Sequence, residues 1–335
     1  MFDGSRILLI GRRSAPILPS LVAALAFGTM FPVAASALHH VDAFHLTAIR
    51  YVLATLAFLA LLWAIEGRAA LNPGRRGLEL WALGSAGFAG FNLLAYLGLG
   101  SSTPQHAAVF VALMPILTLA GNALITRVVP RAATVGFSLL ALAGAALVVS
   151  GGDPAGLVAG GLGLGDLLFL LGVSSFVVYT LGSRRFAGFS PLRYTALSAA
   201  GGTATILATT EIVTLAGAEH TPTLADLGAD WWQVAYVVVI GAVIALLAFN
   251  EGVRRLGAPN AALFGNLIPI VTLAISIAQG YRPAGLVYAG MAVTVGALAG
   301  ANLTGRRAGS VQARERPTSE AWAATRSANT AKSRA

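Results

Sequence analysis

Charged residues and cysteine are both scarce in this chain of 335 residues. Cysteine is absent, so no disulfide contributes to stability, and Asp, Glu, Lys and Arg together make up 10% of the residues. Soluble proteins typically carry about 25% charged residues, whereas the hydrophobic share here reaches 56%. So little polar sequence leaves no room for a sizeable aqueous domain, and the composition indicates a protein embedded almost entirely in a membrane.

Lysine is nearly absent as well, since Lys332 is the only one in the chain. A phosphate-binding loop of the type GxxxxGK followed by Ser or Thr requires a lysine, which excludes ATP-driven transport through such a loop. The rings of like charge and the carbonyl filters of cation channels also have no counterpart in the sequence. We expect a protein that is not an enzyme and has no cofactor, no metal ligand and no catalytic residue.

Ten long apolar runs account for most of the sequence. A helix needs roughly 20 mostly apolar residues to cross the hydrocarbon core of a bilayer, and each run is of about that length. The sequence therefore predicts an all-α polytopic membrane protein of ten transmembrane helices, at residues 16–37, 45–65, 79–100, 104–126, 132–150, 166–183, 191–216, 231–253, 258–279 and 284–304.

The basic residues fall in every second gap between these runs. All but two of the 22 Lys and Arg residues lie in those gaps or near the termini, and Arg50 and Arg282 are the two that fall on the other side. Positively charged loops are retained in the cytoplasm, so both termini are predicted to be cytoplasmic. Because the positive charge is dispersed over several patches, nucleic-acid binding is not expected. The expected partners are membrane lipid and a small-molecule substrate.

One half of the sequence repeats in the other. Residues 107–110 (AAVF) and 113–116 (LMPI) match residues 261–264 (AALF) and 267–270 (LIPI) at a constant spacing of 154 residues. Each half contains five runs, an odd number, so the two halves must enter the membrane in opposite directions. We expect two inverted five-helix repeats, residues 16–151 and 164–304, and a disordered basic cytoplasmic tail over 305–335. Inverted repeats with a midplane site between them are widespread in secondary transporters.

These features resemble the drug/metabolite transporter superfamily in its ten-helix bacterial form, the EamA type. The resemblance rests on the small residues that lead to Pro115 and Pro269 in the fourth and ninth runs, and on Arg50-Tyr51 at the entry to the second. It implies two five-helix repeats in the bacterial inner (cytoplasmic) membrane, with both termini in the cytoplasm. The overall pattern is most similar to amino acid exporters, including the aromatic amino acid and paraquat type.

The resemblance has one departure, at the ends of the fourth and ninth runs. The family often has Gly-Glu there, whereas this chain has Thr126-Arg127 and Gly280-Tyr281. The departure indicates a divergent branch and weakens the transfer of any particular substrate.

Polar side chains near the middle of the runs form the candidate substrate site. Such residues are costly in lipid and face the bundle interior or a water-filled cavity. Centring each run on the bilayer predicts one layer made of Thr29, Asn92, Ser174, Ser175 and Asn266. Aromatic and imidazole side chains of the same site are Tyr96, His106, Phe110, Tyr179 and Phe264. The alternative is that these amides and hydroxyls only join neighbouring helices.

Charge is expected to be absent from the midplane. Asp166, Glu211 and Glu251 all fall within about two turns of a helix end, whereas a pump with a central proton relay needs a carboxylate at the midplane. We therefore predict a facilitated secondary transporter of small neutral or zwitterionic metabolites, most of all amino acids, that works by alternating access. A monomer is expected, and a dimer remains open.

Two prolines and one carboxylate are predicted to take part in gating. Pro115 and Pro269 should kink their helices and serve as bending points during gating. Glu251 precedes Arg254 and Arg255 and is predicted to form a cytoplasmic ion pair or a gate contact.

Two other functions remain as alternatives. One is export of cationic drugs by the same fold, which the lack of a midspan carboxylate disfavours. The other is an intramembrane protease, because residues 163–166 read Gly-Leu-Gly-Asp. That chemistry needs two carboxylates that share a proton, and Asp166 is the only Asp within a predicted span. We interpret Asp166 as a helix N-cap.

Overall fold

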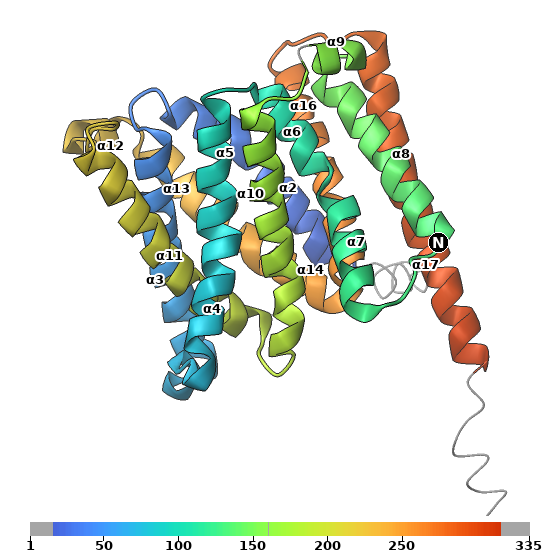
Figure 1. Ribbon diagram of the computed structural model, residues 1–335, viewed down its shortest axis with the longest axis horizontal. Helices are drawn as coiled ribbons and strands as arrows, with labels where there is room; N and C mark the ends of the chain where they lie inside the picture. The colour runs from blue at the N-terminus through green and yellow to red at the C-terminus, as the bar shows by residue number, and fades with distance from the viewer. Residues whose placement is uncertain (1–15, 160, 316–335) are drawn as a thin grey trace, which may run out of the picture.

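The ten predicted spans are all present as helices. The computed structural model describes residues 16–159 and 161–315, and within these residues ten helical stretches are long and apolar enough to cross a membrane. The all-α polytopic architecture is thereby confirmed (Figure 1). The spans, in order, are α2 (Leu18–Ala37), α3 (Ala43–Glu66), α4 with α5 (Gly77–Gly84, Phe91–Leu99), α6 with α7 (Pro104–Ala112, Met114–Thr126), α8 (Ala132–Val149), α10 (Leu164–Gly182), α11 (Pro191–Leu215), α13 with α14 (Trp231–Val238, Ala245–Leu256), α15 with α16 (Ala258–Leu263, Ile268–Ala278) and α17 (Gly285–Glu315).

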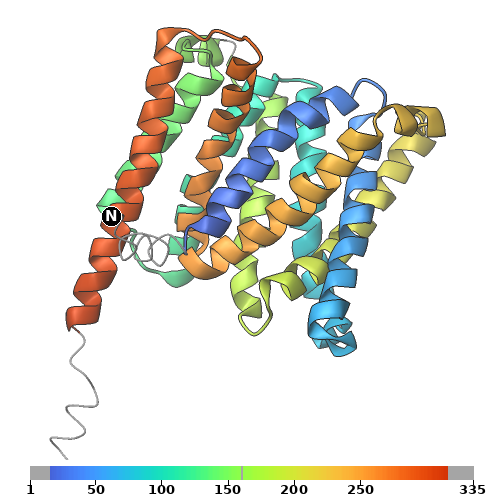
Figure 2. The ribbon, with the colours of Figure 1, turned by 180° about the vertical axis from the view of Figure 1, so that it is seen from behind.

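The connecting segments gather at two opposite ends of the bundle (Figures 1 and 2). We call one the basic end; it comprises residues 67–76, 127–131 and 183–190, with the short helices η1 (Arg68–Leu71), η2 (Gly74–Arg76) and η4 (Ser183–Phe186). The acidic end comprises residues 38–42, 100–103, 150–159, 161–163 and 216–230, with α9 (Pro154–Ala159) and α12 (Leu224–Ala229). The arginine-rich gaps of the sequence therefore lie at one end of the bundle, and the arginine-poor gaps lie at the other.

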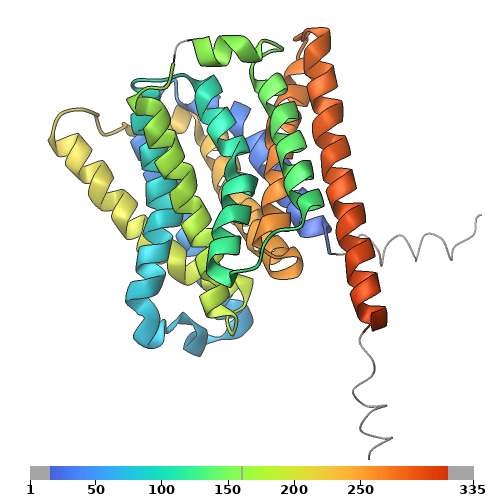
Figure 3. The ribbon, with the colours of Figure 1, turned by 45° about the vertical axis from the view of Figure 1, so that its right-hand side comes forward.

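Helices of the two halves interlock. In the first half α2 packs on α14 and α16, and in the second half α10 packs on α5 and α7. Helix α3 lies against α11, and α8 pairs with α17 at one edge of the bundle (Figure 3). Each half therefore completes its packing with helices of the other, and neither forms a separate body.

Helix irregularities recur at the spacing of the sequence repeat. The third span passes through a π-helical turn, η3 (Ser85–Gly90), and the eighth passes through another, η5 (Val239–Ile244), 154 residues later. The fourth span is interrupted at Leu113, and the ninth contains a 3₁₀ turn, η6 (Phe264–Leu267). Pro115 and Pro269 each lie two residues after the end of an interruption. Proline has no backbone N–H to donate to the preceding turn, which accounts for the break in the helix. Both π turns and both interruptions lie inside spans, where irregular turns are often functional.

Glycine permits the closest contact between the halves. A Cβ atom on Gly84 of α4 would lie 1.8 Å from the carbonyl oxygen of Ser198 in α11, and one on Gly202 would lie 2.5 Å from the carbonyl oxygen of Gly84. The two backbones therefore touch, as small residues allow in membrane helices. Hydroxyl pairs reinforce this region, since Thr55 and Thr203 approach to 2.8 Å.

The start of the predicted tail needs one correction. The sequence places the end of the last span at residue 304, whereas α17 is helical to Glu315. The remainder of the predicted tail, like the basic residues before residue 16, lies outside the described residues.

Substitution of Gly84 tests the contact between α4 and α11. We expect Gly84→Ala to destabilise the protein by about 1–3 kcal/mol, because the added methyl group meets a backbone oxygen that cannot move alone. The measurement is the thermal unfolding midpoint in detergent. Gly136→Ala on α8 is the matched control, since a Cβ there meets nothing within 4 Å. Equal midpoints for the two variants would contradict the packing described.

Candidate functional site

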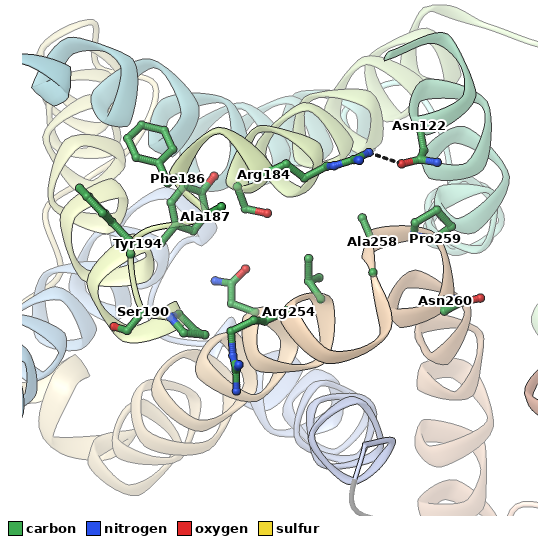
Figure 4. Close-up of a pocket in the computed structure, with 16 residues that line it drawn as sticks. Asn122, Arg184, Phe186, Ala187, Ser190, Tyr194, Arg254, Ala258, Pro259 and Asn260 are labelled. Atoms are coloured by element: carbon green, nitrogen blue, oxygen red, sulfur yellow. Dashed lines mark hydrogen bonds between the residues drawn. The ribbon is translucent and has the colours of Figure 1, made fainter. Parts of the chain in front are cut away.

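A cavity of about 590 Å³ enters the bundle from the basic end (Figure 4). It lies between α7, the connection from α10 to α11, the end of α14 and the start of α15. Polar and aromatic side chains dominate its wall, and no carboxylate is among the lining residues. Those residues are Asn122, Ser183, Arg184, Phe186, Ala187, Phe189, Ser190, Pro191, Tyr194, Asn250, Val253, Arg254, Gly257, Ala258, Pro259 and Asn260.

Two guanidinium groups give the cavity mouth a positive charge. Arg184 donates from Nη1 to Oδ1 of Asn122 over 2.5 Å, which joins the second half to the first across the opening (Figure 4). Arg254 forms an ion pair with Glu251, which is itself outside the lining. An arginine presents several N–H donors in a planar fork that suits carboxylates. The mouth therefore favours an anionic group over a cationic one.

The inner end of the cavity is a buried amide. Asn250 of α14 is only 4% exposed, and its Nδ2 donates to Tyr179 Oη at 2.8 Å and to Thr195 Oγ1 at 2.7 Å. Its Oδ1 has no partner within the described chain. Because a buried amide oxygen without a hydrogen bond is costly, Asn250 has an unused capacity to bind a polar group from the cavity.

Aromatic rings close the cavity towards the middle of the bundle. The rings of Tyr194 and Tyr179 stack at 5.1 Å, and Tyr194 Oη donates to the backbone oxygen of Tyr179 at 2.7 Å. Phe176 lies 5.7 Å from Tyr179 and 5.4 Å from Phe249, and Phe88 of the first half lies 4.9 Å from Tyr179. These rings form a continuous apolar layer across the two halves, which we call the aromatic layer.

Two His–Asp pairs join the halves at the acidic end. Nδ1 of His40 lies 3.0 Å from Oδ2 of Asp230, and Nδ1 of His106 lies 2.7 Å from Oδ1 of Asp166. Both carboxylates are almost completely buried. The end opposite to the cavity is therefore held by charge-assisted hydrogen bonds between the two halves.

The environment of Asp166 corrects its predicted role. Gly163, not Asp166, is the N-cap of α10, and Asp166 is the third residue of the helix, where its Oδ2 accepts from the Gly163 N–H at 2.8 Å. A carboxylate at this position reaches back over the first turn. Its other described partners are His106 and Ser102, neither of them a carboxylate. The arrangement resembles no proton-sharing pair of acids and gives the protease hypothesis no support.

None of the predicted substrate-binding residues lines the cavity. Tyr179 comes nearest, because it bonds Asn250 from behind. Asn92 lies deeper, bonded to Arg50, while Tyr96 bonds Thr47 at 2.9 Å near the acidic end.

The remaining predicted residues are distributed over the bundle and do not contact one another as one group in the contacts described. Thr29 accepts from Tyr236, Ser175 donates to its own helix, Ser174 is half-buried, Phe110 contacts Phe169, and Phe264 packs in an apolar cluster. Asn266 is 1% exposed and neither end of its amide has a partner in the described chain. Most of the predicted central layer therefore consists of separate polar contacts, with Asn266 the unpaired exception.

Glu251 has the contacts expected of it. Its carboxylate forms ion pairs with Arg254 and Arg255 beside the cavity mouth. The interruptions before Pro115 and Pro269 are likewise present, and the part of all three residues in gating stays a prediction.

Arg50 is not at the outer end of the bundle, where the sequence places it. The sequence assigns it to the outer side because it follows a gap by only a few residues. In the structure it is the eighth residue of α3, is 8% exposed, and donates from Nη2 to Asn92 Oδ1 at 2.8 Å. The arginine side chain reaches sideways between helices rather than back to the end of the bundle, so the guanidinium is internal.

Asn250 and Tyr194 were not predicted from the sequence. Asn250 follows Tyr96 by 154 residues, which is the spacing of the two π-helical turns, whereas the sequence match of residues 93–96 (LLAY) with residues 246–249 (LLAF) has a spacing of 153 and pairs Tyr96 with Phe249. Thr195 and Thr47 occupy matching positions in the second helix of each half, five residues after the N-caps Ser190 and Asp42. The bonds Thr195–Asn250 and Thr47–Tyr96 are therefore equivalent contacts at opposite ends.

Comparison with known proteins gives one family. The model of the EamA-like transporter family matches residues 15–150 and again residues 163–303. The uncharacterized transporter YrdR of Bacillus subtilis (strain 168) is 34% identical over 269 residues, which is 79% of this chain and 84% of that protein. The uncharacterized transporter YyaM of the same organism is 28% identical over 236 residues, 69% of this chain and 75% of that protein. A crystal structure at 25% identity superposes with a TM-score of 0.71 and covers 88% of this chain and 98% of its own.

Removal of the Tyr179 hydroxyl tests the inner end of the cavity. We expect Tyr179→Phe to lower the free energy of unfolding by about 1–3 kcal/mol, because one N–H of the buried Asn250 amide loses its acceptor while the ring contacts remain. Tyr288→Phe is the matched control, since Tyr288 is 49% exposed on α17. Unfolding midpoints in detergent that fall equally for both variants would argue against the bond.

Proposed function

The chain belongs to the EamA-like transporter family, and from that premise we propose a secondary transporter that exports small neutral or zwitterionic metabolites, amino acids foremost. The observation that carries the proposal is the cavity, which leads from the basic end to Asn250, a residue whose buried amide oxygen has no described partner, and which borders the aromatic layer at Tyr194. A site with few polar groups and an apolar wall suits a solute with a small polar head and an apolar side chain.

Alternating access follows from the two equivalent contacts. At the basic end the pair Thr195–Asn250 borders an open cavity, whereas at the acidic end the pair Thr47–Tyr96 is covered by Phe44, whose ring lies 6.0 Å from that of Tyr96. Inverted repeats that exchange conformations would close the first site and open the second. Tyr96 and His106 would then line the opening at the acidic end, as Asn250 and Asn260 do at the basic end.

The side of the membrane on which the cavity opens depends on the orientation of the protein in the bilayer. The positive-inside rule places the basic end in the cytoplasm, so the described state is inward-open in a bacterial inner membrane. A cytoplasmic solute enters past Arg184 and Arg254, reaches Asn250, and leaves at the acidic end after the halves exchange positions.

Charge separates this proposal from export of cationic drugs. The cavity carries two guanidinium groups and its lining includes no carboxylate, so a cationic solute meets repulsion at the mouth. A zwitterion can place its carboxylate near either arginine. The carboxylates of the described spans lie towards the span ends, whereas a central proton relay needs one at the midplane. The proposed transport is therefore facilitated by the substrate gradient.

Transport itself is the first test. Proteoliposomes that contain the purified protein should take up at least one member of a radiolabelled panel of neutral amino acids faster than empty liposomes, and without an imposed pH gradient. Uptake of a quaternary ammonium dye should not exceed the empty-liposome rate. Failure of every amino acid would overturn the proposed substrate class, and a strict requirement for a pH gradient would overturn facilitated transport.

Orientation has an independent test, because the chain contains no cysteine. Single cysteines are introduced by Val129→Cys at the basic end and Ala218→Cys at the acidic end, both exposed positions. A membrane-impermeant maleimide should label the Ala218 variant in intact spheroplasts and the Val129 variant only after lysis. The reverse pattern would mean that the cavity faces outward.

A further inference from the structure

Arg50 is a positive charge buried inside the bundle. It is about 10 Å along α3 from the first residue of that helix, within a membrane span, and its residue surface is 8% exposed. Ionisable side chains inside a membrane are expensive, and they face the bundle interior and mark substrate or ion pathways. The position of Arg50 therefore calls for a partner of opposite charge.

No such partner is found in the described chain. Nη2 of Arg50 donates to the amide oxygen of Asn92, and Nη1 approaches the sulfur of Met30 at 3.5 Å, which is a weak acceptor. The guanidinium carbon lies 4.7 Å from the centre of the Tyr51 ring. Nε has no acceptor among the residues that the structure describes, and no described carboxylate forms an ion pair with Arg50. A buried charge left uncompensated in this way is destabilising.

A chain of ring contacts through the aromatic layer links Arg50 to the cavity. The ring of Tyr51 lies 5.3 Å from that of Phe88, and Phe88 lies 4.9 Å from Tyr179, which bonds the cavity residue Asn250. Phe88 and Tyr51 come from the first half and Tyr179 from the second. Relative movement of the halves would therefore part these rings and connect Arg50 with the solute.

We propose that Arg50 binds the carboxylate of the transported solute in the middle of the pathway. The inference rests on the proposed function and adds to it the group that recognises the substrate. A carboxylate fits because its two oxygens accept parallel N–H bonds from one guanidinium. Asn92 is bonded to Arg50 and supplies an amide beside it, while Phe88 and Tyr51 provide an apolar wall for the rest of the solute. A phosphate dianion would need more positive charge than this single arginine supplies.

The test compares ligands that differ only in charge at the carboxyl group. For the amino acid that the wild type transports fastest, inhibition of its uptake by the unlabelled amino acid is compared with inhibition by its carboxamide. The wild type should discriminate strongly against the carboxamide. Arg50→Gln should raise the half-saturation concentration of the amino acid by about 10- to 100-fold and abolish the discrimination. Arg282→Gln, an exposed arginine outside the basic end, should leave both unchanged.

A second variant separates binding from folding. Asn92→Asp places a carboxylate beside Arg50, and we expect a higher unfolding midpoint together with weaker amino acid uptake, because the new side chain competes with the substrate carboxylate. A merely structural Arg50 predicts greater stability with unchanged discrimination, and that result would overturn the proposal. Arg50→Gln with wild-type discrimination would overturn it as well.

A ligand-binding assay keeps the inference distinct from the proposed function. Benzoate and 3-phenylpropionate should raise the unfolding midpoint of the wild type but not of Arg50→Gln, whether or not amino acids are transported. If no amino acid is transported and carboxylates still stabilise through Arg50, the proposed function fails and the binding site stands. If amino acids are transported but neither carboxylate nor amino acid shifts the midpoint through Arg50, the binding site fails alone.

Discussion

The interior of a bilayer offers no water, so polar groups inside this bundle must find partners within the protein. Many described hydroxyl and amide side chains bond the backbone of their own helix, as Ser138 and Thr180 do, and others bond between helices, as Ser85 does to Thr205 and Thr55 to Thr203. The exceptions are informative because the constraint is strict. The buried side-chain atoms without a described partner include Ser20 Oγ and Gln233 Oε1, and also Arg50 Nε, Asn250 Oδ1 and both ends of the Asn266 amide. Arg50 and Asn250 lie on either side of the aromatic layer, where a solute crossing the bundle would supply the missing bonds.

The fold could be predicted from the sequence because the apolar runs are long and the pattern occurs twice. Apolar runs of about 20 residues have one interpretation, and the spacing of 154 residues reappears in the two π-helical turns and in the helix interruptions before Pro115 and Pro269. Neither signal depends on side-chain detail. The EamA type was likewise identified from spread-out features, and the family comparison supports it over both halves.

The residues of the cavity could not be predicted in the same way, for a physical reason. Centring each span on the bilayer treats depth as the only coordinate, whereas lining a cavity depends on which way a side chain points around its helix. By that measure Asn92 lies near the centre of its predicted span and Asn250 near the end of its own, so Asn250 was left out, although Asn92 bonds Arg50 and Asn250 opens on the cavity. The long side chain of Arg50 adds a second difficulty, because its Cα lies towards one end of the span while its charge reaches inward. Tyr179 was predicted because it is aromatic and lies near the middle of its span, whereas its bond to Asn250 is visible only in the folded chain.

The π-helical turn η5 lies directly before the segment of α14 that carries Asn250. A π turn accommodates one more residue than an α-helical path would need, and its wider rings are less stable than those of the flanking helix. Passing that residue along the chain would rotate the following segment by about 100° with little change in helix length. Asn250 would then swing away from Tyr179 and Thr195, and a neighbouring face of α14 would border the cavity. Through η5 a local slip in register would change which side chains of α14 border the cavity, without displacement of any whole helix.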